Sequence, residues 1–390
     1  MHPISPSTTP PPRLIFWELT TGCNLRCAHC RASASELMSP DELGYAQCCR
    51  IVDEIAEFAP FILVLSGGEP LWRPDVFDIA RRATRRGIRV ALATNGTLVD
   101  EVMAERIRDS GIQRVAVSLD GVDPATHDRF RGQAGAFEAA CNGLRCLREV
   151  GLSTQVNTTV ARHNAHQLPR MLKLAAELGV DAFHLFLLVP VGCGLTISEQ
   201  ESVPAQQAEE ILRWFYDQSL QTKLELKATC APHYYRIVRQ QRAESRHAGI
   251  PLAPLPATGM HSMTKGCLAG SGVCFLSSKG EVYPCGYLPV SAGNLLSEPF
   301  ARIWEHAGIF RSLRGEDSLE GWCGVCEFQN VCSGCRARAY GVTGNYLAEE
   351  PDCLYMPKGW KPAMGCPGPR DTRVTAGKSA APISVLRADN

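Results

Sequence analysis

The 390-residue chain has no net charge, and it has no long apolar run. Lys+Arg and Asp+Glu number 40 each, so the formal charge is zero at pH 7. This balance gives no electrostatic case for a nucleic acid or an anionic membrane surface as a partner. No apolar stretch of roughly 18 residues or more occurs, which excludes a transmembrane helix. We therefore expect neither nucleic acid nor membrane among the partners.

The two ends of the chain have little to bury. Residues 1–12 are rich in proline, serine and threonine and lack the apolar core of a secretory signal. Residues 357–390 are rich in proline and glycine. We expect a flexible N-terminus, a disordered tail and a cytoplasmic protein.

Cysteine, in contrast, is abundant, with 18 residues. In a reducing compartment this number favours metal binding over disulfides. Cys23, Cys27 and Cys30 form a C-x3-C-x2-C run directly after an apolar segment. Thiolates are soft ligands that suit iron–sulfur clusters or zinc. A structural zinc site normally has four protein ligands. The three local thiolates therefore leave one coordination position without a protein ligand and open for chemistry.

Alternating apolar runs and helical patterns fill residues 13–222 with six strand–helix units. The expected strands are 14–19, 61–65, 88–93, 114–119, 154–160 and 183–189. Such a series predicts a parallel sheet with right-handed crossovers. Since six units fall short of eight, we predict an α/β fold, a partial (βα)6 TIM-like barrel. Chemistry in these barrels lies at the C-terminal ends of strands, where the cysteine run follows the first strand.

The cysteine run and the Ser-Gly-Gly-Glu-Pro segment at 66–70 together resemble the radical S-adenosylmethionine (SAM) enzymes. In that family the three cysteines hold a 4Fe–4S cluster whose fourth iron binds SAM. One electron then cleaves SAM into methionine and a 5′-deoxyadenosyl radical. The resemblance implies a set of SAM-binding residues: Gly67, Gly68, Glu69, Ser118 and Arg131. A surface ion pair is the alternative for Arg131, and Gln155 and Asn157 either line the pocket or bond within the core.

A second group of cysteines lies in residues 266–356: Cys267, Cys274, Cys285, Cys323, Cys326, Cys332, Cys335 and Cys353. Few long apolar runs accompany them, so we expect this region to need its metal for folding. It resembles the SPASM extension, which carries one or two auxiliary iron–sulfur clusters. The resemblance implies one 4Fe–4S cluster on Cys323, Cys326, Cys332 and Cys353, and another on Cys267, Cys274, Cys285 and Cys335. Two structural zinc sites are the alternative, because C-x2-C pairs serve both metals.

Residues 223–265 are expected to connect the two regions and to contact substrate. Within them, His233 is a candidate metal ligand or a structural histidine. Four strings, at 30–34, 226–236, 285–288 and 334–340, resemble the SAM-dependent heme synthases of the siroheme-derived pathway. That family converts two propionates of iron-coproporphyrin III to vinyls by oxidative decarboxylation, which gives heme b. The resemblance thus implies this porphyrin and an electron donor such as flavodoxin or ferredoxin as partners.

A porphyrin with carboxylates needs a broad apolar slot and cationic anchors. The candidates in the matching strings are Arg31, Lys227, Arg236, Arg336 and Arg338, together with His233, Tyr234 and Tyr235 for stacking or hydrogen bonds. The sequence assigns no catalytic side chain. Three other functions stay open: another tetrapyrrole-modifying enzyme, such as one for a heme d1 or didecarboxysiroheme step, a peptide-maturing SPASM enzyme, and a non-catalytic zinc-binding protein.

Overall fold

The structure is a computed structural model that describes residues 9–250 and 265–360. Residues 1–8, residues 251–264 of the expected connector and the tail from residue 361 lie outside the described residues, and with them the predictions made for these stretches. The last residues of the expected N-terminal segment are tied down, because the carbonyl of Pro10 accepts a hydrogen bond from Trp304 Nε1 at 3.0 Å.

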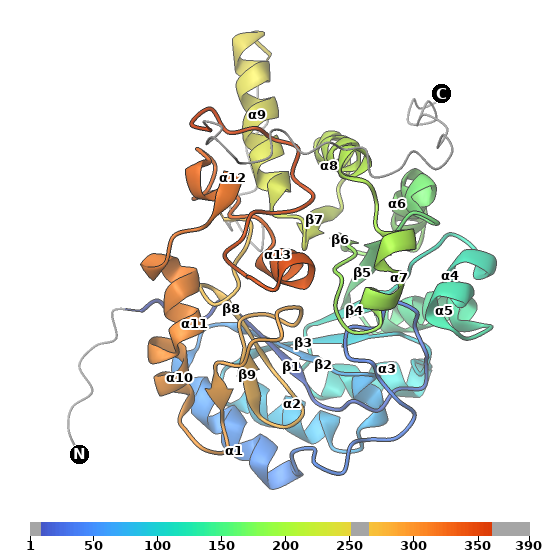
Figure 1. The fold of residues 1–390 in the computed structure, drawn as a ribbon. Helices are drawn as coiled ribbons and strands as arrows, with labels where there is room; N and C mark the ends of the chain where they lie inside the picture. The colour runs from blue at the N-terminus through green and yellow to red at the C-terminus, as the bar shows by residue number, and fades with distance from the viewer. Residues whose placement is uncertain (1–8, 251–264, 361–390) are drawn as a thin grey trace.

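A curved sheet of parallel strands forms the centre of the molecule (Figure 1). Its first six strands pair in chain order: β1 (Leu14–Glu18), β2 (Ile62–Ser66), β3 (Arg89–Thr94), β4 (Arg114–Ser118), β5 (Ser153–Val160) and β6 (Ala182–Leu187). These strands and their parallel order confirm the predicted barrel-like α/β fold.

The sheet has a seventh parallel strand that the sequence analysis did not predict. β7 (Glu225–Thr229) pairs in parallel with β6 and lies in the segment expected to be a connector. Leu226 and Ala228 are buried and alternate with less buried neighbours, as a half-buried strand requires. At five residues, the strand is too short and too polar to stand out as an apolar run.

The cysteine-rich region adds strands to the other edge of the same sheet. β8 (Val273–Leu276) pairs in parallel with β1, and β9 (Glu281–Tyr283) and β10 (Gly293–Asn294) continue the sheet in antiparallel fashion. The cysteine-rich region is therefore built onto the barrel.

Helices cover the outside of the sheet and follow its strands (Figure 1). Those of the strand–helix units are α1 (Tyr45–Ile55), α2 (Val76–Arg85), α3 (Glu101–Asp109), α5 (Ala136–Glu149), α6 (Leu168–Glu177) and α8 (Ala205–Ser219). The others are α4 (Pro124–Arg131), α7 (Gly194–Glu201), α9 (His233–His247), α10 (Phe300–His306), α11 (Gly308–Arg311), α12 (Gly321–Val325) and α13 (Arg336–Thr343). Within the described ranges, no helix combines the length and apolarity needed to cross a membrane.

One hydrophobic core joins the barrel and the cysteine-rich region. Ile15 and Trp17 of β1 belong to the same buried cluster as Phe300, Trp304 and Phe310 of α10 and α11. Burial of each large apolar side chain stabilises the fold by about 1.5–3 kcal/mol. Part of the cysteine-rich region thus has an apolar core, in addition to the metal that the sequence analysis expected it to need.

Candidate functional site

The loop after β1 presents its three cysteines to hydrogen-bond donors. The main-chain N–H groups of Leu25 and Ala34 point at the sulfurs of Cys23 and Cys30, each at 3.4 Å. The third sulfur, that of Cys27, receives a guanidinium N–H at 3.8 Å. N–H donors favour the thiolate form of a cysteine. The donor set around this loop therefore fits an iron–sulfur cluster held by three thiolates.

Glycines in neighbouring loops fix the backbone of the cysteine loop. A Cβ atom on Gly68 would lie 2.4 Å from the carbonyl oxygen of Gly22. A Cβ atom on Gly132 would lie 2.3 Å from the carbonyl oxygen of Arg26, and one on Gly192 would lie 2.3 Å from the carbonyl oxygen of Arg31. Each clash is with main chain, which a rotamer change cannot relieve. The loop is thus held by the segments that follow β2, α4 and β6.

Glu69 joins the ends of two strands. Its side chain is fully buried, and its carboxylate accepts hydrogen bonds from the N–H groups of Leu71 and Asn95 and from the hydroxyl of Thr94, at 2.8–3.1 Å. Burial raises the pKa of Glu69 to about 7. The structure therefore gives Glu69 a role in holding the loops together, and its contact with SAM stays a prediction.

Arg131 forms a buried ion pair rather than a surface one. Its Nη2 lies 2.6 Å from Oδ2 of Asp120, a side chain with no exposed area. Burial by itself would raise the pKa of Asp120, but the charge of Arg131, together with His29, His127 and the N–H group of Thr159, lowers that pKa overall. The same guanidinium contacts the sulfur of Cys27. Arg131 therefore links the cysteine loop to the end of β4.

A cavity of about 350 Å³ lies within the barrel and connects the two cysteine regions. Its lining at one end consists of Cys23, Cys27, Cys30, Gly67 and Gly68, and its lining at the other end includes Cys267, Cys285 and Cys335. Between them it is lined by polar and aromatic residues that include Ser118, Arg131, Asn157, Phe186, Tyr235 and Tyr287. Of the two polar residues on β5, Asn157 thus lines the cavity, while Gln155 bonds to Asn157 and His184.

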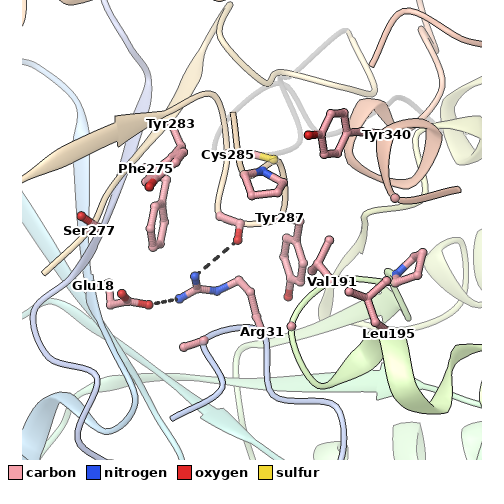
Figure 2. A pocket seen from close by; sticks show the side chains of 16 residues that line it. Glu18, Arg31, Val191, Leu195, Phe275, Ser277, Tyr283, Cys285, Tyr287 and Tyr340 are labelled. Atoms are coloured by element: carbon pink, nitrogen blue, oxygen red, sulfur yellow. Dashed lines mark hydrogen bonds and ion pairs between the residues drawn. The ribbon is translucent and has the colours of Figure 1, made fainter. Parts of the chain in front are cut away.

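A second cavity, of about 370 Å³, adjoins the first, and Figure 2 shows side chains that line it. The two share Arg31, Phe275 and Tyr287 in their linings. Arg31 donates hydrogen bonds to Glu18 at 2.8 Å and to the carbonyl of Gly286 at 3.3 Å. Its guanidinium carbon lies 4.5 Å from the centre of the Phe275 ring. Arg31 is therefore a fixed cation at the boundary of the two cavities.

Only some of the expected substrate cations reach these cavities. Lys227 lines the first cavity, and burial lowers its pKa to about 8. In contrast, Arg236 pairs with a partly buried glutamate at 2.5 Å and Arg338 with a buried one at 3.2 Å. Arg336 is buried and donates to main-chain carbonyls. The prediction that these three arginines anchor a substrate is therefore not supported by their placement.

The first expected auxiliary set comes together as predicted from the resemblance. One small cavity is lined by Cys323, Cys326, Cys332 and Cys353. Main-chain N–H groups point at three of these sulfurs at 3.3–3.4 Å. These residues fit a cluster held by four thiolates.

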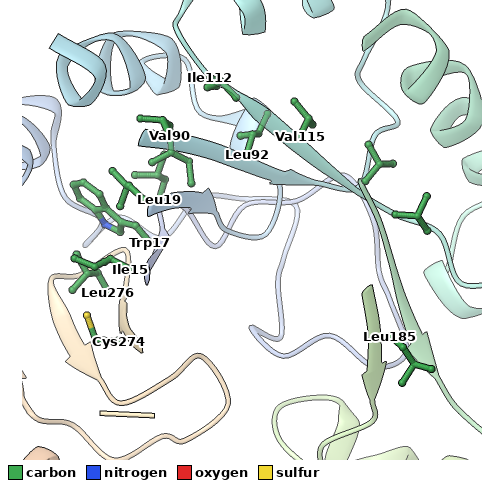
Figure 3. Packing of buried hydrophobic residues seen from close by; sticks show 14 of the residues in the cluster. Ile15, Trp17, Leu19, Val90, Leu92, Ile112, Val115, Leu185, Cys274 and Leu276 are labelled. Carbon is green, nitrogen blue, oxygen red and sulfur yellow. The ribbon is translucent and has the colours of Figure 1, made fainter. Parts of the chain in front are cut away.

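The second expected set is divided. Cys274 lies on β8 and packs in the hydrophobic core beside Ile15 and Leu276 (Figure 3). Its neighbours Val273 and Phe275 line the first cavity, which connects the two cysteine regions. Successive side chains of a strand point to opposite faces, so Cys274 points away from the other three thiols. A different cysteine, Cys230, lines the cavity with them.

A single metal ion does not match this arrangement. Zinc requires its ligands at about 2.0–2.3 Å from one point. Among the residues that the structure describes, no three or more Cys, His, Asp or Glu side chains come close enough together for one ion. His233 is buried, and burial lowers its pKa to about 4. Thiols arranged around a cavity suit a multi-iron cluster better than zinc.

Comparisons with known proteins agree with this geometry. Residues 17–175 match the family model of the radical SAM superfamily, and residues 267–335 match that of the SPASM iron–sulfur cluster-binding domain. The AdoMet-dependent heme synthase of Methanosarcina barkeri is 51% identical over 89% of this chain and 97% of its own length. The AdoMet-dependent heme synthase of Nitratidesulfovibrio vulgaris is 44% identical over 91% of this chain and 95% of its own length.

A solved structure shares the fold at low sequence identity. It is Streptococcus suis SuiB bound to S-adenosylmethionine, which superposes with a TM-score of 0.69 at 16% identity. The match covers 89% of this chain and 78% of SuiB. At this identity the similarity concerns the fold alone.

Proposed function

Since the chain belongs to the radical SAM superfamily and, within it, to the family of the AdoMet-dependent heme synthases, we propose that it converts iron-coproporphyrin III to heme b. Two propionates would become vinyls by oxidative decarboxylation. The observation that carries this proposal is the single cavity that connects the three-cysteine loop with Cys267, Cys285 and Cys335. A substrate in this cavity lies between a radical source and an electron acceptor.

A bound cluster and SAM supply one-electron cleavage of SAM to methionine and a 5′-deoxyadenosyl radical. In the proposed reaction each of two propionates gives one hydrogen atom from its β-carbon to that radical. The side chain then loses carbon dioxide and one electron, and a carbon–carbon double bond forms. Each vinyl therefore requires one electron for SAM and returns one electron from the substrate. A flavodoxin- or ferredoxin-type donor would supply the first.

The two adjoining cavities have the chemistry that a porphyrin carboxylate needs. Phe275 and Tyr287 offer aromatic walls to both. Arg31 lies at their boundary, and a guanidinium donates a planar fork that matches a carboxylate. Lys227 adds a second cation deeper in the barrel. The tetrapyrrole would thus extend across the boundary, with one propionate directed towards the cysteine loop.

The test is anaerobic turnover followed by mass spectrometry. The protein, reconstituted with iron and sulfide, is mixed with SAM, a reductant and iron-coproporphyrin III. We expect stepwise loss of carbon dioxide and two hydrogens from two side chains, with 5′-deoxyadenosine formed for each. If SAM is cleaved and the porphyrin stays unchanged, the proposed substrate is wrong, and other tetrapyrroles and peptides become the substrates to test.

A further inference from the structure

The cavity that connects the two cysteine regions has four cysteines at the end formed by the C-terminal region, and three of them were expected there. Cys267, Cys285 and Cys335 line it together with Cys230, whereas Cys274 is absent from its lining. We infer that Cys230 is the fourth thiolate of the auxiliary cluster held by Cys267, Cys285 and Cys335. This inference concerns the cluster and holds whichever tetrapyrrole is the substrate.

The fold brings Cys230 to these thiols although it is distant in sequence. Cys230 directly follows β7, which is parallel to the other barrel strands. Its position is therefore the C-terminal edge of the sheet, where the loop after β1 also lies. The segment after β7 then approaches the start of the cysteine-rich region, since a Cβ atom on Gly266 would lie 2.7 Å from the carbonyl oxygen of Pro232. Residues 230 and 267 are thus neighbours in space.

The backbone at Cys230 is held in an uncommon conformation. Its φ is 56°, in the left-handed region that non-glycine residues seldom adopt. Such a conformation persists where the surroundings fix it. Here Arg338 of α13 donates a hydrogen bond to the carbonyl of Cys230 at 2.9 Å. The same helix begins directly after Cys335, so one element fixes two of the four cysteines.

The surroundings of the four thiols differ from those of Cys274. Cys230, Cys267, Cys285 and Cys335 line one cavity. Cys274, in contrast, belongs to the buried hydrophobic cluster and lies opposite Ile15 in the pairing of β8 with β1. Cys274 therefore has the surroundings of a core residue.

The test compares two matched variants, Cys230→Ala and Cys274→Ala. Both are made in a protein whose loop cysteines 23, 27 and 30 are replaced by alanine, so that only auxiliary clusters remain. Iron and sulfide are counted after anaerobic reconstitution, and Mössbauer spectra identify the cluster type. One 4Fe–4S cluster contains about four irons, and we expect Cys230→Ala to lose between one of them and all of them. Cys274→Ala should keep its full iron content.

A third variant covers the case in which Cys230→Ala does not fold. Cys230→Ser keeps the size of the side chain and replaces sulfur with oxygen. If Cys230 is a ligand, the spectrum of one cluster changes or its iron is lost. A full iron content with an unchanged spectrum in Cys230→Ser or Cys230→Ala would overturn the inference, and so would loss of iron from Cys274→Ala.

Discussion

At the scale of single residues, the site depends on buried charges that are paired within the protein. Arg131 and Asp120 form such a pair beside the cysteine loop, 2.6 Å apart. Arg338 and Glu350 form another beside Cys335. Buried charges are expensive unless they are paired, so these residues fix the positions of the loops that carry the cysteines. Arg31 and Lys227 line the cavities, as Arg131 does, and they are the two cations that the proposed function assigns to substrate carboxylates.

Replacing Arg131 by methionine is expected to destabilise the fold strongly. The change leaves the Asp120 carboxylate buried without its partner, which typically costs about 3–5 kcal/mol. Arg129→Met is the matched control, because that arginine is exposed on the same helix. Anaerobic urea unfolding of both variants measures the difference. A loss below about 1 kcal/mol for Arg131→Met would contradict the structural role given to this pair.

The charge of Lys227 is expected to make substrate binding depend on pH. Burial lowers its pKa from 10.5 to about 8. The side chain is therefore charged below that value and becomes neutral as the pH rises through it. If Lys227 binds a propionate, KM for iron-coproporphyrin III should rise above pH 8 in the wild type. Lys227→Arg stays charged at these pH values and should lose this rise. Equal pH profiles for the two proteins would exclude the contact.

At the scale of elements, the C-terminal ends of the strands assemble the site. The loop after β1 packs against Gly68, which follows β2, so closely that no side chain fits at that position. Cys230 reaches the same cavity from the end of β7. Parallel strands place all these ends at one edge of the sheet.

Gly68→Ala tests this packing. Its Cβ atom would meet two main-chain oxygens at 2.4 and 2.7 Å, and overpacking of this kind costs about 1–3 kcal/mol. We expect the cysteine loop to shift and the variant to bind less iron after reconstitution. The control is Gly308→Ala, where an added Cβ atom has no neighbour within 4 Å. Identical iron contents in the two variants would mean that the loop does not depend on this contact.

Sequence patterns predicted the elements whose signal is local. The apolar runs of β2 and β6 and the spacing of Cys23, Cys27 and Cys30 are of this kind. β7 was missed, because its polar residues outnumber its buried ones. Cys274 was assigned to a cluster without regard to strand alternation. The face to which its side chain points is set by the pairing of the short β8 with β1, some 260 positions away in the sequence, and cysteine spacing does not show that pairing. Arg338 was expected at the substrate because it lies in one of the matching strings. Its ion pair with the buried Glu350 is a tertiary contact that sequence spacing does not show.

At the scale of the whole molecule, the barrel and the cysteine-rich region form one sheet and share one core. They differ in what stabilises them locally. α10 and α11 bury Phe300, Trp304 and Phe310. α12, in contrast, has no buried residue, and it carries Cys323 of the four-cysteine set.

Removal of the metal should therefore loosen one part of this region more than the other. Without iron, we expect fast amide hydrogen exchange in residues 321–335 and 344–356, which have thiols in place of an extensive apolar core. Residues 300–311 should stay protected by their packing. Hydrogen exchange of the loaded and the chelator-treated protein measures both segments in one experiment. Equal protection of 321–335 in the two states would show that metal is not needed for its folding.

We propose that the barrel positions a propionate of iron-coproporphyrin III for hydrogen transfer to the radical derived from SAM. The most direct measurement uses substrate with deuterium on the β-carbons of its propionates and follows the 5′-deoxyadenosine by mass spectrometry. We expect one deuterium to be transferred to 5′-deoxyadenosine for each vinyl formed. Vinyl formation with unlabelled 5′-deoxyadenosine, or SAM cleavage with no change in the porphyrin, would contradict it.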